Sequence, residues 1–239
     1  MSSNSHGIAI PPGVVEITWY GHGTWLLRYL DQTVLLDPFL NNNPKAPVKA
    51  DAVQCNTILV THGHFDHIDD CVSIAKRCGA KVITNFEIGN WLEKQGVSEP
   101  VGMNIGGQFQ HAGMTIKMTN AVHSSSLPDG SYGGWPAGFL ITVEGKTIYF
   151  AGDTAPFGDM QYLSPKIDLA VLPIGDLFTM GPQDSLQAIQ WLQPAQVVGG
   201  HFDTWPPIQQ DGDQWANSVR SQGVSDPIVT APGQPFRLD

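Results

Sequence analysis

Cysteine is scarce in this chain of 239 residues, which contains three cysteines and no C-x-x-C pair. Three thiols leave one without a partner, so the count argues against a disulfide framework and favours a reducing compartment. The N-terminal segment MSSNSHGIAIPPG also lacks the basic and apolar regions of a secretory signal. We therefore expect a cytoplasmic protein.

Basic residues are also few, with 12 Lys and Arg against 22 Asp and Glu and a formal net charge of −10. Nucleic-acid binding depends on clustered Lys and Arg, so nucleic acid is not an expected partner. No apolar run approaches the roughly 20 residues that cross a bilayer, and we expect no membrane association. Hydrophobic residues make up 41% of the chain and charged residues 14%, which indicates a packed globular protein.

The apolar patterns predict a chain that alternates strands with helices. Apolar residues spaced three and four apart predict a helix over residues 68–78, which Gly79 ends. This helix lies between predicted strands at 57–61 and 81–84, and such a unit normally pairs its strands in parallel. Further strands are predicted at 14–20, 25–29, 33–36, 169–172 and 196–200, with a second helix at 182–192.

Two stretches share one pattern, which indicates two similar halves. WLLRYLDQTVLLDPF and, later, FLITVEGKTIYFAGDT each contain a strand, a short turn, a second strand and then an acidic residue. The two acids, Asp37 and Asp153, are expected at the same end of their strands, where ligand sites of α/β folds gather. No linker or low-complexity tract divides the chain, so we expect one domain over residues 1–239 with a flexible tail at 1–13.

The densest group of ligand-type side chains is THGHFDHIDD, residues 61–70, between a predicted strand and a predicted helix. His62 and His64 are two apart in extended chain and point the same way, so they can share one cation. Asp66 and His67 lie at the turn into the helix and can face a second cation. Four such side chains at an apolar strand end are costly unless a metal compensates them. The alternative is a polar loop that is rich in histidine by chance, which suits one histidine better than the whole string.

Three later residues, His123, Asp153 and His201, each follow a predicted strand and can reach the same edge of the sheet. In this order the motifs resemble the metallo-β-lactamase superfamily. The chain is also similar to a narrower group, the UPF0173-type uncharacterised metal-dependent hydrolases of the ascorbate-phosphate lactonase-like branch. The segments that carry this similarity are GHGTWLL, LLDPFL, VTHGHFDHIDD, AVHSSS, FAGDT, PIGDLFTMGP and HFDTWPPI. The resemblance runs from Val14 to about Ile208. It implies an α/β (α+β) fold, a four-layer αββα sandwich with metals at one edge between two sheets.

The same resemblance implies a role for each motif residue. A first metal would be held by His62, His64 and His123, a second by Asp66, His67 and His201, and Asp153 would bridge both. Asp37 would support a ligand histidine without touching metal. Asp203 departs from the group, in which Asn is common at that position, and its extra charge bears on substrate preference.

A site of this kind needs no nucleophile from the protein. Its mixed ligands suit Zn²⁺ best, with Mn²⁺, Fe and Ni²⁺ open, and two such cations can turn a shared water into hydroxide near neutral pH. Asp66 and His22, the latter in a G-H-G turn, are the candidates for direct catalytic roles, although a structural hydrogen bond explains His22 equally well. Asp176, Asp203 and Trp205 are candidates for the rim of the substrate site, with a turn role as the alternative for Asp176.

The sequence predicts the substrate and the function class less specifically than the metal ligands. No Lys or Arg lies within five residues of the motif positions, and enzymes that grip phosphates usually add such residues. A small neutral ester, lactone or amide is therefore favoured over a phosphodiester. An iron-dependent redox protein on the same fold and a non-catalytic metal-binding protein are the alternatives. The first class tends to replace a motif histidine and the second to lose ligands, whereas all seven positions are filled here. A homo-oligomer also stays open.

Overall fold

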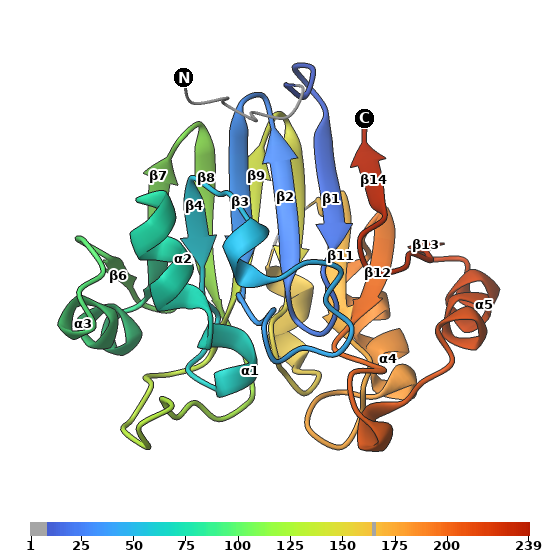
Figure 1. The fold of residues 1–239 in the computed structure, drawn as a ribbon. Coiled ribbons are helices and arrows are strands. Elements are labelled where there is room, and N and C mark those ends of the chain that lie inside the picture. The colour runs from blue at the N-terminus through green and yellow to red at the C-terminus, as the bar shows by residue number, and fades with distance from the viewer. Residues whose placement is uncertain (1–8, 164–165) are drawn as a thin grey trace.

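The computed structural model describes residues 9–163 and 166–239, which form two facing β-sheets with helices on both outer surfaces (Figure 1). Each sheet has seven strands. The layers therefore run helices, sheet, sheet and helices. This is the αββα sandwich that the motifs predicted.

The two sheets take their strands from separate parts of the chain, except for the last strand. The first sheet, in spatial order, consists of β14 (Pro235–Leu238), β1 (Val15–Trp19), β2 (Trp25–Tyr29), β3 (Gln32–Leu36), β4 (Thr57–Leu59), β5 (Lys81–Asn85) and β6 (Val101–Met103). The second consists of β13 (Asp226–Ile228), β12 (Gln196–Gly200), β11 (Leu169–Pro173), β10 (Lys146–Phe150), β9 (Ala137–Val143), β8 (Met114–Asn120) and β7 (Gln108–His111). The helices are α1 (Phe65–Ile68), α2 (Cys71–Cys78), α3 (Phe86–Lys94), α4 (Pro182–Leu192) and α5 (Gly212–Gln222), with 3-10 turns η1 (Ala50–Ala52), η2 (Gly158–Tyr162) and η3 (Pro206–Ile208).

The inner faces of the two sheets share one apolar core, because strand residues alternate between the two faces of a sheet. In β3, Val34 and Leu36 point into this core, whereas Leu35 packs on the outer side with the helices. In β10, Ile148 and Phe150 point into the same core from the second sheet. Burial of these side chains holds the sheets face to face and fixes the edge at which their loops meet.

The outer faces are covered by amphipathic helices. Ile74 of α2 and Leu92 of α3 pack on the first sheet. Ile189 of α4 and Trp215 of α5 pack on the second. Strands covered on both faces are apolar throughout, as in β11 with the sequence LAVLP. Within the described residues, no helix combines the length and the apolar character needed to span a membrane.

The two sheets repeat one strand pattern, which gives structural form to the similarity between the two halves of the sequence. β1, β2 and β3 pair antiparallel, and β3 to β6 pair in parallel. β8, β9 and β10 pair antiparallel in the same way, and β10 to β13 pair in parallel. Asp37 follows β3 and Asp153 follows β10, so the two acids occupy matching places at one edge.

The helix predicted over residues 68–78 differs from the structure, because it is interrupted between α1 and α2. Asp70 lies at the break, and its carboxylate accepts hydrogen bonds from the amides of Leu40 and Asn41 at 2.7 and 2.9 Å. A side chain that bonds to the loop after β3 replaces the helical continuation at this point. The break turns α1, with Asp66 and His67, toward the strand ends.

Part of the flexible tail predicted at residues 1–13 is fixed in the structure. Ile10 is buried, and its amide donates to the carbonyl of Leu30 at 2.8 Å. The apolar side chain and this hydrogen bond fix the chain ahead of β1. Residues 1–8 of the predicted tail lie outside the described residues.

Candidate metal centre

All seven predicted metal ligands lie together at the edge where strands of both sheets end. They are carried by the segment between β4 and α2 (His62, His64, Asp66 and His67), by the loops after β8 and β10 (His123 and Asp153) and by the residue after β12 (His201). Six of the seven contribute donor atoms to groups in which all atoms lie within 4.8 Å of one another. His62, His64 and His123 form one group, and Asp66, His67 and His201 form another together with His22. Strand pairing thus gathers residues that are far apart in the sequence.

The first donor group consists of three imidazoles. Nε2 of His62 lies 3.0 Å from Nδ1 of His64, and Nε2 of His123 lies 3.3 Å from the same atom. Donor atoms around a tetrahedral Zn²⁺ with bonds of about 2.0–2.1 Å are roughly 3.3 Å apart, so this spacing fits such an ion. Burial, followed by the neighbouring His67, lowers the pKa of His62 well below its usual value. A neutral imidazole keeps the lone pair that a metal needs.

The second donor group, by which we mean the predicted ligands Asp66, His67 and His201 without His22, combines a carboxylate with two imidazoles. Oδ2 of Asp66 lies 3.9 Å from Nε2 of His201 and 4.0 Å from Nε2 of His67. Both Nε2 atoms are buried, and neither has a well-formed hydrogen bond among the described residues. Buried polar atoms without a well-formed hydrogen bond are costly, and a cation between the carboxylate and the two nitrogens would satisfy them. The residues of this group therefore also fit a metal ion.

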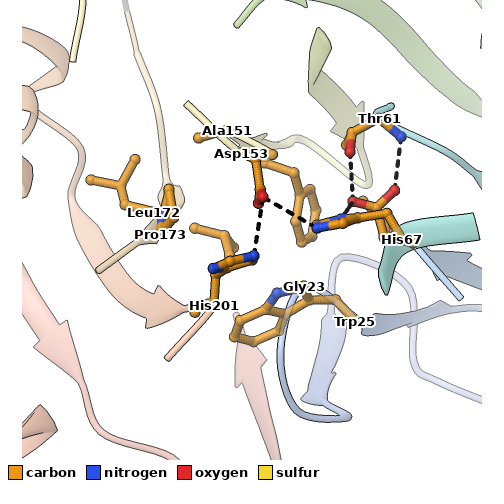
Figure 2. Close-up of a pocket in the computed structure, with 15 residues that line it drawn as sticks. Gly23, Trp25, Thr61, His67, Ala151, Asp153, Leu172, Pro173 and His201 are labelled. Carbon is orange, nitrogen blue, oxygen red and sulfur yellow. Dashed lines mark hydrogen bonds and ion pairs between the residues drawn. The ribbon is translucent and has the colours of Figure 1, made fainter. Parts of the chain in front are cut away.

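Asp153 lies between the two groups, and Figure 2 shows its carboxylate pointing toward His67 and His201. Its Oδ2 atom is 3.0 Å from Nε2 of His201 and 3.3 Å from Nε2 of His67. The same oxygen is 3.6 Å from Nε2 of His123 and 3.9 Å from Nε2 of His62. Burial alone would raise the pKa of Asp153, but His201 and His67 hold it well below its usual value. A charged carboxylate in this place suits the bridging role that the resemblance implies, and the coordination itself stays a prediction.

Asp37 contacts Nδ1 of His67, the ring nitrogen that does not belong to the donor group. Nδ1 of His67 donates to Oδ2 of Asp37 at 2.8 Å, and the amide and hydroxyl of Thr61 donate to Oδ1 and Oδ2, both at 2.7 Å. This fixes the orientation of the ring and leaves Nε2 facing the donor group, as carboxylates behind metal-ligating histidines do. Burial alone would lower the pKa of His67, but Asp153 and Asp37 raise it well above its usual value. The same negative charges attract a cation to Nε2.

Replacing Asp37 by Asn is expected to weaken metal binding by about 10–100-fold, the usual effect of removing such a supporting group. The amide is similar in size but carries no charge, and its NH2 group must face either Nδ1 of His67 or the amide of Thr61, both of which are donors. Competition with a chromogenic chelator measures the change. The exposed Asp31 gives the control variant Asp31→Asn. Equal affinity of the Asp37 variant and the parent would contradict the role.

His22 lies against the second donor group and is fully buried. Its Nε2 and Nδ1 atoms are each 2.8 Å from a partner, Oδ2 of Asp66 and Oγ1 of Thr204. Burial, followed by the charge of His201, lowers the pKa of His22 to about 3. The neutral ring therefore donates from Nε2 to the carboxylate and accepts the hydroxyl hydrogen at Nδ1. Burial alone would raise the pKa of Asp66, but the hydrogen bond from His22 and the charge of His67 bring it below its usual value.

Trp205 is the predicted rim residue that packs against the site. Its ring centroid lies 4.8 Å from that of His22, 6.1 Å from that of Phe39 and 6.2 Å from that of Phe65. The indole is partly exposed. It thus connects buried site residues with the surface, and a contact between Trp205 and substrate stays a prediction.

The other two predicted rim residues stabilise their own loops. Oδ1 of Asp203 accepts a hydrogen bond from the amide of Gln210 at 3.0 Å. Asp176 is exposed after β11, and its Oδ1 accepts from the amide of Leu177 at 2.7 Å. Both acids adopt left-handed backbone angles, with φ of 60° and 64°. The turn role considered for Asp176 is therefore present, and substrate contact by either acid stays a prediction.

Three hydroxyl residues support the site, and Thr61 and Thr204 among them were not predicted from the sequence. Two of them, Thr61 and Thr204, bond to Asp37 and to His22 as described above. The third is Ser125, whose Oγ accepts from the amide of Gly63 at 3.1 Å and donates to the carbonyl of Gly133 at 2.9 Å. Each lies within three positions of a motif histidine. That neighbourhood was the available signal.

Comparisons with known proteins agree with this fold. Residues 32–202 match the family model described as Beta-lactamase superfamily domain. A UPF0173 metal-dependent hydrolase of Thermus thermophilus is 45% identical over 227 residues, which span 95% of this chain and 100% of the relative. The structure of Igni18, a metallo hydrolase from the archaeon Ignicoccus hospitalis, superposes with a TM-score of 0.86 at 32% identity and covers 95% of this chain and 99% of that chain. The chain therefore belongs to the UPF0173 metal-dependent hydrolase family within the β-lactamase superfamily.

The same fold also occurs in a protein of different chemistry. CmlA, a diiron β-hydroxylase from Streptomyces venezuelae, superposes with a TM-score of 0.71 at 14% identity and covers 95% of this chain and 54% of that chain. At this identity the likeness shows the fold alone. Fold does not choose between hydrolysis and oxidation, so the reaction has to be argued from the site.

Proposed function

We propose that this chain hydrolyses an ester, lactone, amide or phosphodiester bond of a small molecule with two divalent metal ions, Zn²⁺ being the favoured metal. The observation that carries the proposal is that Oδ2 of Asp153 lies within 3.9 Å of Nε2 atoms from both donor groups. When bound, a pair of such ions supplies an ionised water near neutral pH and stabilises negative charge that develops on an oxygen. Mn²⁺, Fe and Ni²⁺ compete for the same imidazole and carboxylate donors.

The chain itself supplies rigid donors on one side and an opening on the other. His62, His67 and His201 are buried, so packing holds their rings in place. His64 and Asp66 are partly exposed, so substrate reaches the site from their side. Asp66 has a lowered pKa and stays ionised near neutral pH. A lowered pKa makes this carboxylate a better metal ligand than proton acceptor, and a direct catalytic role for Asp66 stays a prediction.

The placement of basic side chains supports a neutral substrate over a phosphorylated one. Arg28 and Arg237 both pair with Glu16, at 3.0 Å each. Arg77 donates to the carbonyls of Ala50 and Val53. These cations are engaged within the fold, whereas enzymes that bind phosphate usually direct Arg or Lys at the substrate. We therefore place ester, lactone and amide bonds ahead of phosphodiester bonds.

Exposed apolar side chains near the opening support a substrate with an apolar group. Phe65 directly follows His64 and is 54% exposed, and Phe178 is 54% exposed on the loop after β11. That loop is tied to the site by the amide of Met180, which donates to the carbonyl of Thr154 at 2.9 Å. Exposed apolar clusters beside a polar site mark ligand-binding surfaces. An acyl or aryl chain fits this surface.

Substitution of Phe178 by Ser is expected to raise KM for an octanoate ester by roughly tenfold and to leave KM for the matching acetate ester unchanged. The difference arises because burying a phenyl ring against a long chain contributes about 1.5–3 kcal/mol, and a short chain does not reach it. Steady-state kinetics with the two esters measure the effect. Ile105, exposed on the loop after β6, gives the control Ile105→Ser. Equal changes for both esters would contradict an apolar contact.

Metal analysis of the purified protein, followed by turnover of a panel of esters, lactones, amides, phosphodiesters and β-lactams, tests the reaction. We expect about two divalent ions per chain, because two donor groups fit one ion each. We also expect hydrolysis that collapses with chelator and returns with added metal. Full turnover by metal-free protein would defeat the proposal. The substrates that turn over decide the bond type.

The two alternative functions make different predictions for the same protein. An iron-dependent redox protein would take up O₂ in the presence of iron and a reductant, which an oxygen electrode detects. His62, His64 and His67 are all present, which favours hydrolysis, because di-iron relatives tend to replace a motif histidine. A non-catalytic metal-binding protein would keep its biological activity after His64→Ala.

For the cellular setting, we propose a cytoplasmic protein that acts on a small molecule, with neither nucleic acid nor membrane as partner and with a homo-oligomer open. Cys55, Cys71 and Cys78 are free thiols, which supports a reducing compartment. Fractionation of cells and sedimentation of the purified chain test the location and the assembly state.

A further inference from the structure

The turn between β1 and β2 places a histidine side chain next to the metal centre. This turn, residues 21–23, is closed by the amide of Thr24, which donates to the carbonyl of Gly21 at 3.1 Å. At its tip, His22 has a φ of 56°, a left-handed angle that is uncommon for residues other than glycine. The side chain is nevertheless fully buried. A strained backbone with a buried polar side chain persists where the surroundings fix it and often accompanies function.

The ring of His22 reaches one ligand of the second donor group. Its Nε2 lies 2.8 Å from Oδ2 of Asp66, and its Nδ1 lies 2.8 Å from Oγ1 of Thr204. Because a carboxylate can only accept, Nε2 is the donor in the first contact. Thr204 contacts the ring on the side away from Asp66, as Asp37 contacts the ring of His67. Asp66 is partly exposed, so this hydrogen bond restricts a carboxylate that packing leaves free.

The backbone of the same turn reaches the other two ligands of that group. The carbonyl of His22 accepts from the amide of His201 at 3.0 Å and from Nε1 of Trp19 at 2.8 Å. Gly23 lies directly against His67, since a Cβ atom at this position would fall 2.6 Å from Cε1 of that ring. One turn of the first sheet therefore contacts all three ligands of the second donor group.

We propose that His22 is a positioning residue that holds Asp66 in place for the second metal, so that the turn at residues 21–23 selectively controls occupancy of that metal position. The inference rests on the proposed two-metal function but concerns binding and not turnover. The first donor group has separate supports, among them Thr61 on His62 at 3.0 Å and Ser125 on Gly63 at 3.1 Å. Loss of His22 therefore leaves the first position intact.

The test compares two amides at position 22 in the full chain. The side-chain nitrogen of Gln reaches the place of Nε2 and can still donate to Asp66, whereas that of Asn reaches the place of Nδ1 and cannot. Asn tolerates a positive φ better than Gln, so backbone strain predicts the opposite order of effects. This reversal separates hydrogen bonding from a merely structural role.

Metal-free protein is titrated with Co²⁺, and absorption spectra resolve the two binding phases. We expect His22→Asn to weaken the second phase by about 10–100-fold, and His22→Gln to leave it within about threefold of the parent. Thr204→Val, which leaves position 22 unchanged, is expected to weaken it by about tenfold. The first phase should be unchanged in all three variants, and His123→Ala assigns it. Circular dichroism of the metal-free proteins checks that each variant folds.

Several outcomes would overturn the proposal. Equal binding by His22→Asn and the parent would remove the positioning role. If His22→Gln loses the second ion as completely as His22→Asn does, His22 is itself a metal ligand. Weakening of both phases together would make the turn a general support of the fold. A parent that binds two ions and hydrolyses nothing would defeat the proposed function and leave this inference standing.

Discussion

Replacing Asp153 by Asn is expected to lower kcat/KM by about a thousandfold or more, as removal of a central charged group from a reaction site does. Oδ2 of Asp153 lies 3.0 Å from Nε2 of His201 and 3.6 Å from Nε2 of His123, so it serves both donor groups. An amide of the same size keeps the packing but removes the charge that attracts two cations. Steady-state kinetics give the rate, and metal analysis should show that less than two ions remain.

A matched control is available nearby. Asp159 in η2 is exposed, and the same exchange, Asp159→Asn, should leave both kinetics and metal content unchanged. If the Asp153 variant keeps both ions and turns over substrate within tenfold of the parent rate, Asp153 is not a ligand shared by the two metals. Loss of secondary structure in that variant would show instead that the charge is needed for folding, and circular dichroism distinguishes this case.

Removal of metal is expected to lower Tm by on the order of 10 °C. Ligand binding to the folded state alone contributes about 4.1 kcal/mol when the free ligand is a thousandfold above Kd. In a domain of this size 1 kcal/mol corresponds to roughly 2–4 °C. Without cations, the buried Nε2 atoms of His67 and His201 keep no well-formed hydrogen bond, so the metal-free fold bears their desolvation cost.

Differential scanning calorimetry with and without chelator measures this difference. His64→Ala, which removes a ligand of the first group, should show a smaller difference between the two conditions than the parent does. His111 is a histidine outside the donor groups, where Nε2 lies 3.1 Å from Oγ1 of Thr57, and His111→Ala should keep the full difference. An unchanged Tm of the parent after complete metal removal would contradict metal-linked stability.

The sequence predicted the metal ligands better than their supports, and the reason is physical. His62, His64, Asp66 and His67 are adjacent in the chain, so their chemistry is visible as one string. The supports are tertiary: Thr204 is 182 positions from the ring that it contacts at 2.8 Å. A hydroxyl residue carries no pattern that distinguishes such a contact from a surface position.

Elements with strong local patterns were also predicted well. The bounds of β12 and α4 in the structure, Gln196–Gly200 and Pro182–Leu192, are those expected from apolar spacing, Gly and Pro. The helix over 68–78 was predicted as continuous because Asp70 gives no breaking signal in sequence. Its interruption depends on the amides of Leu40 and Asn41, which a local pattern does not reveal.

The position of β14 next to β1 has a consequence for how the chain forms during synthesis. Val15 of β1 pairs with Leu238 of β14, so the first sheet receives its outermost strand from a segment that is synthesised long after β1. Until then β1 is an open apolar edge, the kind of surface that captures strands of other nascent chains. Glu16 on β1 pairs with Arg28 and with Arg237, and Arg237 is synthesised only with β14. Until then, Glu16 places a partly compensated negative charge on this strand.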